Sequence, residues 1–213
     1  MPARPPVSLA GPIAGHHLAR LRDRDTASPD FRRSAHALAT LVVAEAMRDA
    51  ETRRVTVATP LAPATADVPA RRVTVVPVLR AGLAMLQPAL DLLPEDTRVG
   101  FLGLARDERT ARATSYLESL PDGLGDDDVL LLDVMIATGG SGTDALRALR
   151  AAGARHLHVA GLLAAPEGIA ALRAAEPEVP ITVAAIDERL DEHSFIVPGL
   201  GDAGDRLFAE PRR

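Results

Sequence analysis

The chain has 213 residues, of which 47% are hydrophobic and 2% aromatic, and its formal net charge is −5. The length suits one substantial α/β domain rather than two, and the hydrophobic fraction excludes a disordered chain. The lack of cysteine excludes disulfides and cysteine-ligated zinc, and the negative charge argues against sequence-independent binding of nucleic acid.

In chain order, the N-terminal part is predicted to be helical. A short helical stretch around residues 16–24 precedes a strong helix start at Ser28-Pro29-Asp30, where Ser28 is the expected N-cap. Apolar residues at helical spacing extend this helix to about Ala50. We therefore expect residues 1–50 to form an N-terminal helical arm of a single domain that spans residues 1–213.

Three segments are not predicted to be central strands of a sheet. Val55 and Val57 alternate with polar residues and indicate a strand at an edge, whereas residues 59–70 are rich in Pro, Ala and Thr and are predicted to be a loop. Residues 106–127 are polar and irregular, which is long for a loop in a compact domain and typical of a functional lid.

From Val73 onward, strands and helices alternate. Strands are predicted at residues 73–79, 98–105, 129–133, 156–165 and 180–186, and helices at residues 83–93, 166–175 and from the Gly-rich turn near 140 to about Ala152, closed by Gly153. This order predicts an α/β fold with a doubly wound, mostly parallel sheet flanked by helices. Three of the strands end in polar or Gly-rich sequence, so we expect these ends to meet at one crevice.

The most informative stretch joins an acid to a Gly-rich turn. Asp133 ends a buried strand, and Thr138-Gly139-Gly140-Ser141 opens a helix whose N-terminus favours an anion. An acid beside an anion cradle suits a sugar phosphate, with the carboxylate on the ribose hydroxyls and the cradle on the 5-phosphate. The stretch is neither a P-loop nor a dinucleotide fingerprint. The alternative is a plain strand-to-helix turn in which Asp133 or Thr138 only caps the helix.

At this point the sequence resembles the uracil phosphoribosyltransferase family over nearly the whole chain. The resemblance rests on residues 133–141 and on four further segments, at residues 76–83, 103–108, 164–169 and 187–205. The last of these is the most specific and points to uracil. The resemblance implies a type I phosphoribosyltransferase fold with a C-terminal base-binding hood at residues 187–208. It also implies conversion of uracil and 5-phosphoribosyl-1-pyrophosphate (PRPP) to UMP and diphosphate in pyrimidine salvage.

The resemblance assigns roles to particular residues. It implies catalytic roles for Asp202 and Arg106, and uracil binding, largely by main-chain groups, at Ile196, Gly201, Asp202 and Ala203. The residues that it implies for PRPP binding are Arg80, Arg106, Asp133, Val134, Met135, Ile136, Ala137, Thr138, Gly139, Gly140, Ser141 and Asp202. All 24 basic residues are arginine, so guanidinium groups, helix N-termini and backbone N–H groups must supply any phosphate clamp.

The expected cofactor is Mg2+, held mainly by PRPP and water rather than by protein ligands. His156 and His158 are not expected to form a metal site. The resemblance also implies a homodimer or higher homo-oligomer, and leaves open whether GTP is an effector. A nucleic acid is not an expected partner, because the net charge is negative. A membrane is not an expected partner either, because no apolar run is long enough to span a bilayer. With no cleavage signal near the N-terminus, the expected location is the cytoplasm.

Several positions depart from the family pattern. Val134 replaces a usual proline, Ser194-Phe195 replaces a usual Gly-Tyr, and Gly142 is less typical. Ser194 matters only where its backbone needs a positive φ. Two alternatives stay open: a PRPP-fold regulator that binds RNA, which would need a basic face, and a paralogue that acts on another base.

Overall fold

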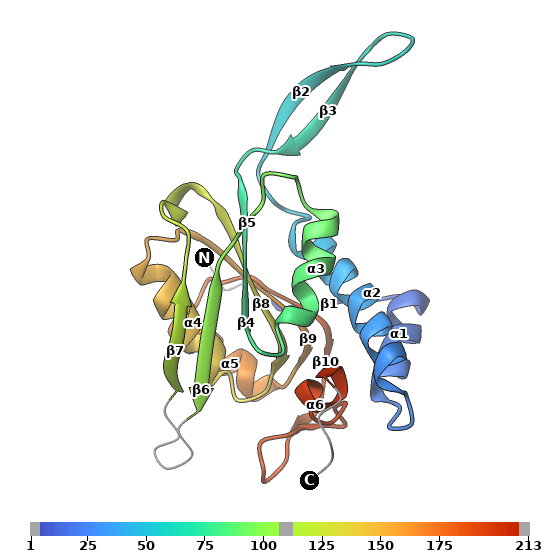
Figure 1. Cartoon of the computed structure of the whole chain (residues 1–213), viewed down its shortest axis with the longest axis vertical. Helices are drawn as coiled ribbons and strands as arrows, with labels where there is room; N and C mark the ends of the chain where they lie inside the picture. Colours follow the sequence, from blue (N-terminus) through green and yellow to red (C-terminus); the bar gives the residue numbers. More distant parts are fainter. Residues whose placement is uncertain (1–4, 107–112, 209–213) are drawn as a thin grey trace.

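The computed structural model describes residues 5–106 and 113–208 of the chain. Its centre is an eight-stranded sheet with the order β1-β10-β9-β8-β4-β6-β7, in which β5 also pairs with β4 (Figure 1). All neighbours run parallel except β6 and β7. The strands are β1 (Val7–Ser8), β4 (Val73–Leu79), β5 (Arg98–Val99), β6 (Phe101–Arg106), β7 (Ala113–Ser119), β8 (Asp128–Ile136), β9 (His156–Ala164) and β10 (Ile181–Ile186).

Helices cover both faces of this sheet. The faces are separate hydrophobic layers, one built with α1, α2 and α3 and the other with α4 and α5. The helices are α1 (Pro12–Arg22), α2 (Ser28–Ala46), α3 (Leu83–Leu92), α4 (Gly140–Ala151), α5 (Pro166–Ala175) and α6 (Ala203–Phe208). The predicted doubly wound, mostly parallel α/β fold is therefore confirmed.

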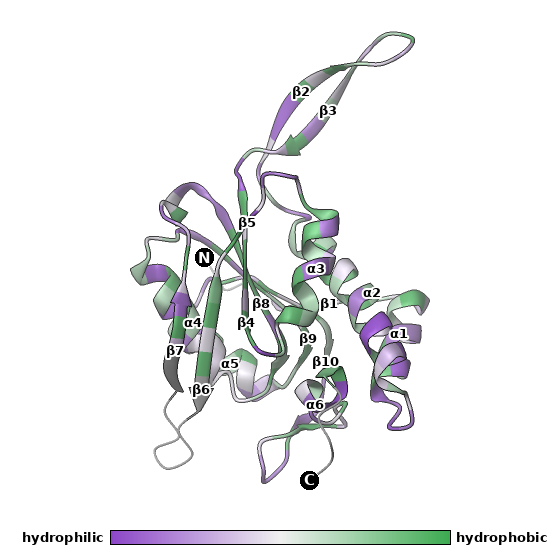
Figure 2. Cartoon of the chain, in the orientation of Figure 1, coloured by the Kyte–Doolittle hydropathy of each residue, from purple (hydrophilic) through white to green (hydrophobic). Residues whose placement is uncertain are grey.

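The central strands are buried on both faces, which explains their nearly continuous apolar sequence. In β8, Leu130 and Leu132 pack with the α2 layer, whereas Val129 and Leu131 pack with the α4 layer. Figure 2 shows the same result as strands that are mostly hydrophobic along the sheet centre, with polar residues gathered at their ends. Side chains alternate between the two layers because successive residues of a strand point to opposite faces.

The N-terminal helices pack onto the sheet. Phe31 and Leu38 of α2 are fully buried and belong to the same layer as the strands β8 and β9. The N-cap of α2 is Ala27, which makes no side-chain capping bond, so the predicted N-cap Ser28 is wrong by one residue. Gly153 has a φ of +90° and its N–H donates to the carbonyl of Arg150, as expected for the residue that ends α4.

Two predicted loops are wrong. Residues 59–70 contain β3 (Pro63–Pro69), which pairs antiparallel with β2 (Thr52–Ala58). Residues 106–127 contain β7, which pairs antiparallel with β6, and the short 3-10 helix η1 (Leu124–Asp126). Both strands are mostly solvent-exposed or at an edge, so they lack the apolar alternation on which the prediction relied. Residues 107–112 of the predicted lid lie outside the described residues.

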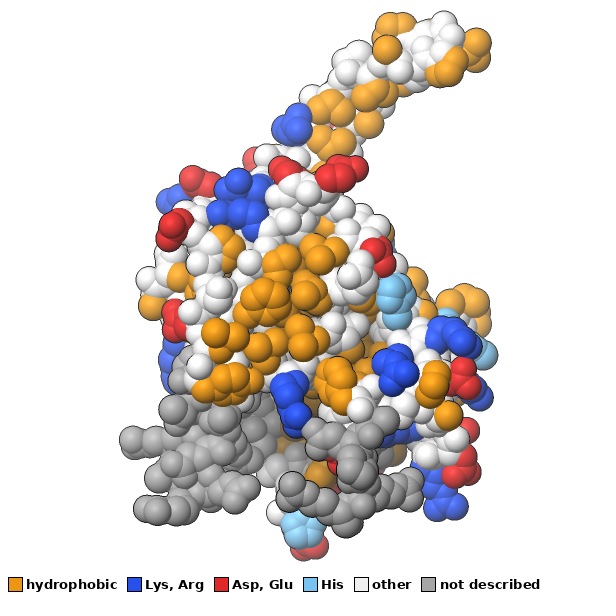
Figure 3. Space-filling view, viewed as in Figure 1, with side chains coloured by type: hydrophobic (Ala, Val, Ile, Leu, Met, Phe, Trp, Pro, Cys, Tyr) orange, Lys and Arg blue, Asp and Glu red, His pale blue; other side chains and the backbone are white. Residues whose placement is uncertain are grey.

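The hairpin of β2 and β3 projects from the body as an arm (Figure 1). It forms its own two-stranded sheet, separate from the main one. Apolar side chains on this arm are accessible to solvent: Val57 is 47% exposed and Leu61 is 98% exposed. Figure 3 shows hydrophobic side chains along the arm and again on the body below it, in the region of α3 and β6. Leu83 and Leu92 of α3 are among the exposed apolar residues of the body.

Within the part of the chain that the structure describes, no helix combines the length and apolar character needed to cross a membrane.

Candidate functional site

The sheet changes winding direction between β4 and β8, which are hydrogen-bonded neighbours. The chain leaves β4 through α3 toward β6 on one side, and leaves β8 through α4 toward β9 on the other. In open α/β sheets, ligands bind at the carboxyl ends of the strands beside such a switch point. Arg80 follows β4 and Ala137 follows β8 at this location.

A cavity of about 330 Å3 lies at these strand ends. Three parts of the chain that are distant in sequence form it: the turn after β4, the turn between β8 and α4, and the C-terminal segment. The lining residues are Val78, Leu79, Arg80, Ala81, Asp133, Met135, Ala137, Thr138, Gly139, Gly140, Ser141, Gly142, Ser194, Phe195, Ile196, Gly201, Asp202, Ala203 and Gly204.

The turn between β8 and α4 has the geometry of an anion cradle. Gly139 is the N-cap of α4 with a φ of +76°, and no side chain caps the helix there. A Cβ at Gly139 would lie 2.6 Å from the carbonyl oxygen of Gly168, so this position admits only glycine. Thr138, Gly140 and Ser141 are exposed toward the cavity. Unpaired N–H groups and the helix dipole at such an N-terminus attract a phosphate.

Asp133 supplies a carboxyl group to the same cavity. Burial raises its pKa to about 7, although the backbone N–H of Met135 donates to the carboxylate and acts in the opposite direction. Asp133 is partly exposed at the cavity wall, and with this pKa its carboxyl group is poised between its neutral and charged forms near neutral pH. A ligand that offers hydroxyl donors would favour the charged form.

The two predicted phosphate-binding arginines differ in what the structure describes. Arg80 is exposed and lines the cavity. Arg106 is the last residue of β6, and its side chain lies outside the described part. The backbone places Arg106 on the strand that pairs with β4, since Val78 and Leu79 are in register with Leu102 and Gly103.

The C-terminal segment closes the opposite side of the cavity. It contains the short strands β11 (Arg189–Leu190) and β12 (Ile196–Val197), which pair antiparallel, and then α6. The Asp191 carboxylate holds the turn between the strands, because it accepts hydrogen bonds from the N–H groups of His193 and Phe195 at 2.9 and 2.8 Å. Ser194 in this turn has a φ of +67°.

Most of the predicted site residues therefore converge on one cavity; among those whose side chains the structure describes, Val134 and Ile136 do not. The side chains of Val134 and Ile136 are 1% and 2% exposed and belong to the two core layers. They face the core because β8 continues to Ile136, three residues beyond its predicted end. Ser194, Phe195 and Gly204 line the cavity without having been assigned to the site. The departures at Ser194 and Phe195 from the family pattern were the sequence signal for two of them.

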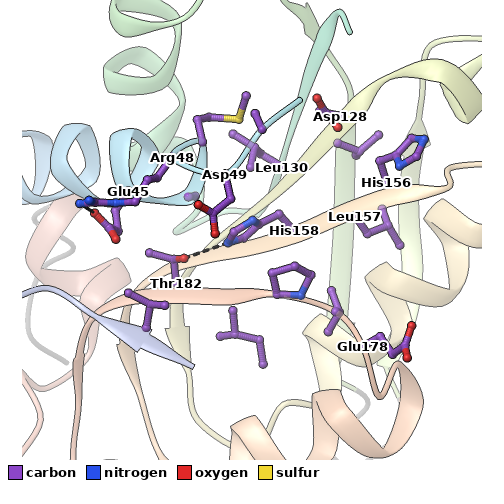
Figure 4. Close-up of a pocket in the computed structure, with 18 of the residues that line it drawn as sticks. Glu45, Arg48, Asp49, Asp128, Leu130, His156, Leu157, His158, Glu178 and Thr182 are labelled. Atoms are coloured by element: carbon purple, nitrogen blue, oxygen red, sulfur yellow. Dashed lines mark hydrogen bonds and ion pairs between the residues drawn. The ribbon is translucent and has the colours of Figure 1, made fainter. Parts of the chain in front are cut away.

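A second cavity, of about 510 Å3, lies at the opposite ends of the strands, where β8, β9 and β10 begin near the C-terminus of α2. Figure 4 shows His158 in its wall beside Asp49, with its ring hydrogen-bonded to the hydroxyl of Thr182 at 2.8 Å. Burial lowers the pKa of His158 to about 4, and the charge of Asp49 opposes that shift.

The arginines on the walls of this second cavity are already paired. Arg71, Arg150 and Arg155 form ion pairs with carboxylates. Among the described residues, no three His, Asp or Glu side chains form a group that could hold a metal.

Known proteins of similar sequence agree on one family. A family model described as "Uracil phosphoribosyltransferase" matches residues 8–209. The uracil phosphoribosyltransferases of Clostridium beijerinckii and Clostridium tetani are each 44% identical over 203 residues, which cover 95% of this chain and 97% of each relative.

Solved structures with a similar fold are also known. The AQ2163 protein from Aquifex aeolicus has a TM-score of 0.88 and 35% identity, over 95% of this chain and 97% of that chain. A hypoxanthine-guanine phosphoribosyltransferase from Bacillus anthracis has a TM-score of 0.53 and 12% identity over 75% of this chain and 80% of that chain, a likeness of fold alone. The match along nearly the full length shows that this chain belongs to the uracil phosphoribosyltransferase family.

Proposed function

We propose that the protein transfers the 5-phosphoribosyl group of PRPP to uracil, forming UMP and diphosphate. One observation carries the proposal: the anion cradle at the start of α4 and the Gly-rich C-terminal segment line a single cavity, in a chain of the uracil phosphoribosyltransferase family. The cavity is large enough to bring a sugar phosphate and a pyrimidine together.

The cradle suits the 5-phosphate of PRPP. The backbone N–H groups and hydroxyls of residues 138–141 would hold the phosphate, and the Asp133 carboxylate would accept hydrogen bonds from the ribose hydroxyls. Arg80 and Arg106 would bind the pyrophosphate, because guanidinium groups match phosphate oxygens. Met135 and Ala137 would contribute to the wall of the PRPP site, and Val134 and Ile136 would act from the core by supporting β8.

The C-terminal segment, residues 187–208, would act as the hood over uracil. Main-chain groups of Ile196, Gly201 and Ala203 would read the base, with Asp202 between the base and PRPP. Uracil presents carbonyl acceptors and N–H donors along its edge, and fixed backbone groups can match that order. Cytosine reverses one of these positions and would leave a buried group unpaired, which is a strong basis for discrimination.

The reaction breaks the bond between the anomeric carbon and the pyrophosphate oxygen and forms a bond from that carbon to a uracil nitrogen, whose proton is released. We infer a transition state with oxocarbenium character, as in glycoside chemistry. The arginines would stabilise the charge on the departing pyrophosphate, so that this group needs no protonation. Asp202 and Arg106 are the proposed catalytic residues because both would contact the reacting substrate.

The donor set fits a magnesium ion that PRPP and water hold for the most part. Asp133 and Asp202 are the carboxylates on the cavity wall, and the described residues provide no cluster of three metal-ligating side chains. Magnesium prefers an octahedral oxygen shell and commonly keeps several waters beside substrate phosphates. When bound, the ion would neutralise part of the pyrophosphate charge.

The exposed arm supports a homodimer or higher homo-oligomer, with the arm packed on a second copy of the chain. An isolated two-stranded hairpin is marginally stable in water, yet β2 and β3 pair only with each other in the described part of the chain. Apolar side chains on the arm and on the body around α3 would be covered in such an assembly. The cytoplasmic location expected from the sequence remains part of the proposal.

A pyrophosphate-release assay with PRPP and magnesium tests the function. Uracil should support release together with formation of UMP, and cytosine and hypoxanthine should not. A preference for another base would favour the paralogue alternative, and addition of GTP to the same assay tests for an effector. Filter binding with RNA tests the alternative of an RNA-binding regulator. That alternative requires the protein to retain RNA on the filter at physiological salt.

A further inference from the structure

The C-terminal segment that closes the cavity has little regular structure of its own. Its strands β11 and β12 contain two residues each, and α6 contains six. Yet Ile196, Gly201 and Ala203 must hold fixed positions if main-chain groups are to distinguish one base from another. Contacts from outside the segment therefore determine how well the site is organised.

Arg22, the last residue of α1, makes three hydrogen bonds of this kind. One of its terminal nitrogens donates to Asp187 Oδ2 at 2.9 Å and to the carbonyl oxygen of Gly199 at 2.9 Å. The other donates to Asp187 Oδ1 at 2.5 Å. The guanidinium group thus joins the N-terminal helices, the end of β10 and the Gly-rich turn in one fork-shaped contact.

Asp187 completes the contact from the other side. Its side chain is 3% exposed, and its Oδ2 atom accepts a hydrogen bond from the N–H of Gly199 at 2.7 Å. Both backbone polar groups of Gly199 are therefore fixed, the N–H by Asp187 and the carbonyl by Arg22. Gly199 has a φ of +65°, and a Cβ there would lie 2.0 Å from the carbonyl oxygen of Ile196. The turn between two base-site residues, Ile196 and Gly201, is held at its centre.

Arg206 of α6 makes a second connection to the same end of α1. It donates to the carbonyl oxygen of Leu200 at 2.8 Å and to that of Asp23 at 2.6 Å, and it also donates to the carbonyl of Leu21. Its guanidinium carbon lies 4.3 Å from the centre of the Phe31 ring. The last carbonyl groups of α1 thus find partners in the C-terminal segment. Gly199 is bound directly by Arg22 of α1, and Leu200 is connected to the end of α1 through Arg206.

We propose that Arg22 and Asp187 are positioning residues for the base, which act by fixing Gly199 and through it the main chain of Ile196 and Gly201. This inference rests on the proposed function. Neither residue lines the cavity, so both act through the turn and not on the substrate. In the described part of the chain, the side chains of Arg22 and Asp187 hydrogen-bond to each other and to Gly199 and not to residues 138–141 of the phosphate cradle, so we expect the effect to be specific to the base.

The test is steady-state kinetics of UMP formation with Arg22→Ala, with uracil and PRPP varied in turn. We expect the KM for uracil to rise about tenfold or more, as for loss of a hydrogen bond to a charged group, and the KM for PRPP to stay within about twofold. Arg22→Lys should restore part of the affinity for uracil, because one ammonium group can reach Asp187 but cannot reproduce the fork.

The control is Arg20→Ala, on the same helix. Arg20 pairs with Asp30 at 3.4 Å, with side chains 45% and 40% exposed, so its removal should leave both KM values unchanged. If Arg22→Ala does not fold, Asp187→Asn replaces it, because this variant removes the charge and keeps an acceptor for the Gly199 N–H. An unchanged KM for uracil in a folded variant, or equal rises in both KM values, overturns the inference. If wild type and Arg20→Ala form no UMP, the proposed function itself fails.

Discussion

Thr138, two residues before α4, and Asp202, the residue before α6, line the same cavity, although they belong to distant parts of the chain. The first lies beside a helix N-terminus that attracts anions, and the second lies in the segment that would cover a base. A phosphate site and a base site must be a sugar's length apart for phosphoribosyl transfer. Both residues line one cavity, as the proposed transfer would need.

Two adjacent glycines in the cradle should separate protein strain from ligand contact. A Cβ at Gly139 would lie 2.6 Å from the Gly168 carbonyl, whereas a Cβ at Gly140 would meet only Thr138 Oγ1, at 3.6 Å. Gly139→Ala should therefore lower the free energy of unfolding by roughly 2 kcal/mol or more. Gly140→Ala should leave stability within about 0.5 kcal/mol and raise the KM for PRPP, because its methyl group would enter the cavity where the proposed phosphate site lies. Urea unfolding and PRPP kinetics measure the two effects, and equal stability losses would contradict this assignment.

Ser194 is expected to destabilise the turn between β11 and β12. Its φ of +67° is in the left-handed region, which costs a residue with a Cβ about 1–2 kcal/mol relative to the right-handed region. Ser194→Gly should raise the free energy of unfolding by roughly 0.5–1 kcal/mol, after allowance for the greater flexibility of the unfolded chain. Ser194→Ala is the matched control and should bring no gain, because alanine keeps the Cβ. A gain of the same size in both variants would show that the hydroxyl, and not the backbone, is responsible.

The doubly wound order of the sheet could be predicted because its strands are long and apolar. The runs in β4, β8 and β9 are buried on both faces, and such runs are readable without knowledge of tertiary contacts. The β3 and β7 strands could not be found this way. Pro63 and Pro69 are the first and last residues of β3, and its side chains are mostly exposed. The structure of this strand is therefore determined by pairing with its neighbour and not by the local preference of its residues.

The cradle could also be predicted, since its residues are contiguous and their chemistry is local. The contact of Arg22 with Asp187 and Gly199 could not, because it joins opposite ends of the chain. Arginine at a helix C-terminus is common on an exposed surface, so its sequence position carries no sign of a buried partner. Such long-range ion pairs depend on how helices dock, which the sequence pattern does not specify.

PRPP binding should depend on the ionisation of Asp133. Burial raises the pKa of this carboxyl group to about 7, while the ribose hydroxyls would bind the charged form. Among the described side chains, Arg80 and Asp202 are the other charged groups that line the same cavity. The value of kcat/KM for PRPP should therefore fall about tenfold for each pH unit below pH 7 and level off above it. Asp133→Asn should be less active, and its kcat/KM should not show the pH dependence that comes from Asp133. Any titration of PRPP itself would appear in the profiles of both proteins. Parallel profiles for the two proteins would contradict the role of Asp133.

His158 should make the protein less stable in acid, and its effect opposes that of Asp133. Burial lowers the pKa of His158 to about 4 against an ordinary value of 6.5, so between these pH values the unfolded chain binds a proton that the native state does not. The histidine contribution to stability is therefore complete above pH 6.5 and is lost as the pH falls toward 4. The raised pKa of Asp133 has the opposite sign, because the native state there binds the extra proton and stability falls as the pH rises toward 7.

A comparison of wild type with His158→Gln separates the two contributions, since Asp133 is common to both proteins. Glutamine keeps a polar group near Thr182 but cannot be protonated in this range. Its loss of packing should lower the free energy of unfolding equally at each pH. On acidification from pH 7.5 to pH 5, wild type should therefore lose roughly 2 kcal/mol more than the variant, as measured by urea unfolding at both pH values. Equal losses in the two proteins would mean that His158 titrates at its ordinary pKa, and hence that the ring is open to water when the protein is folded.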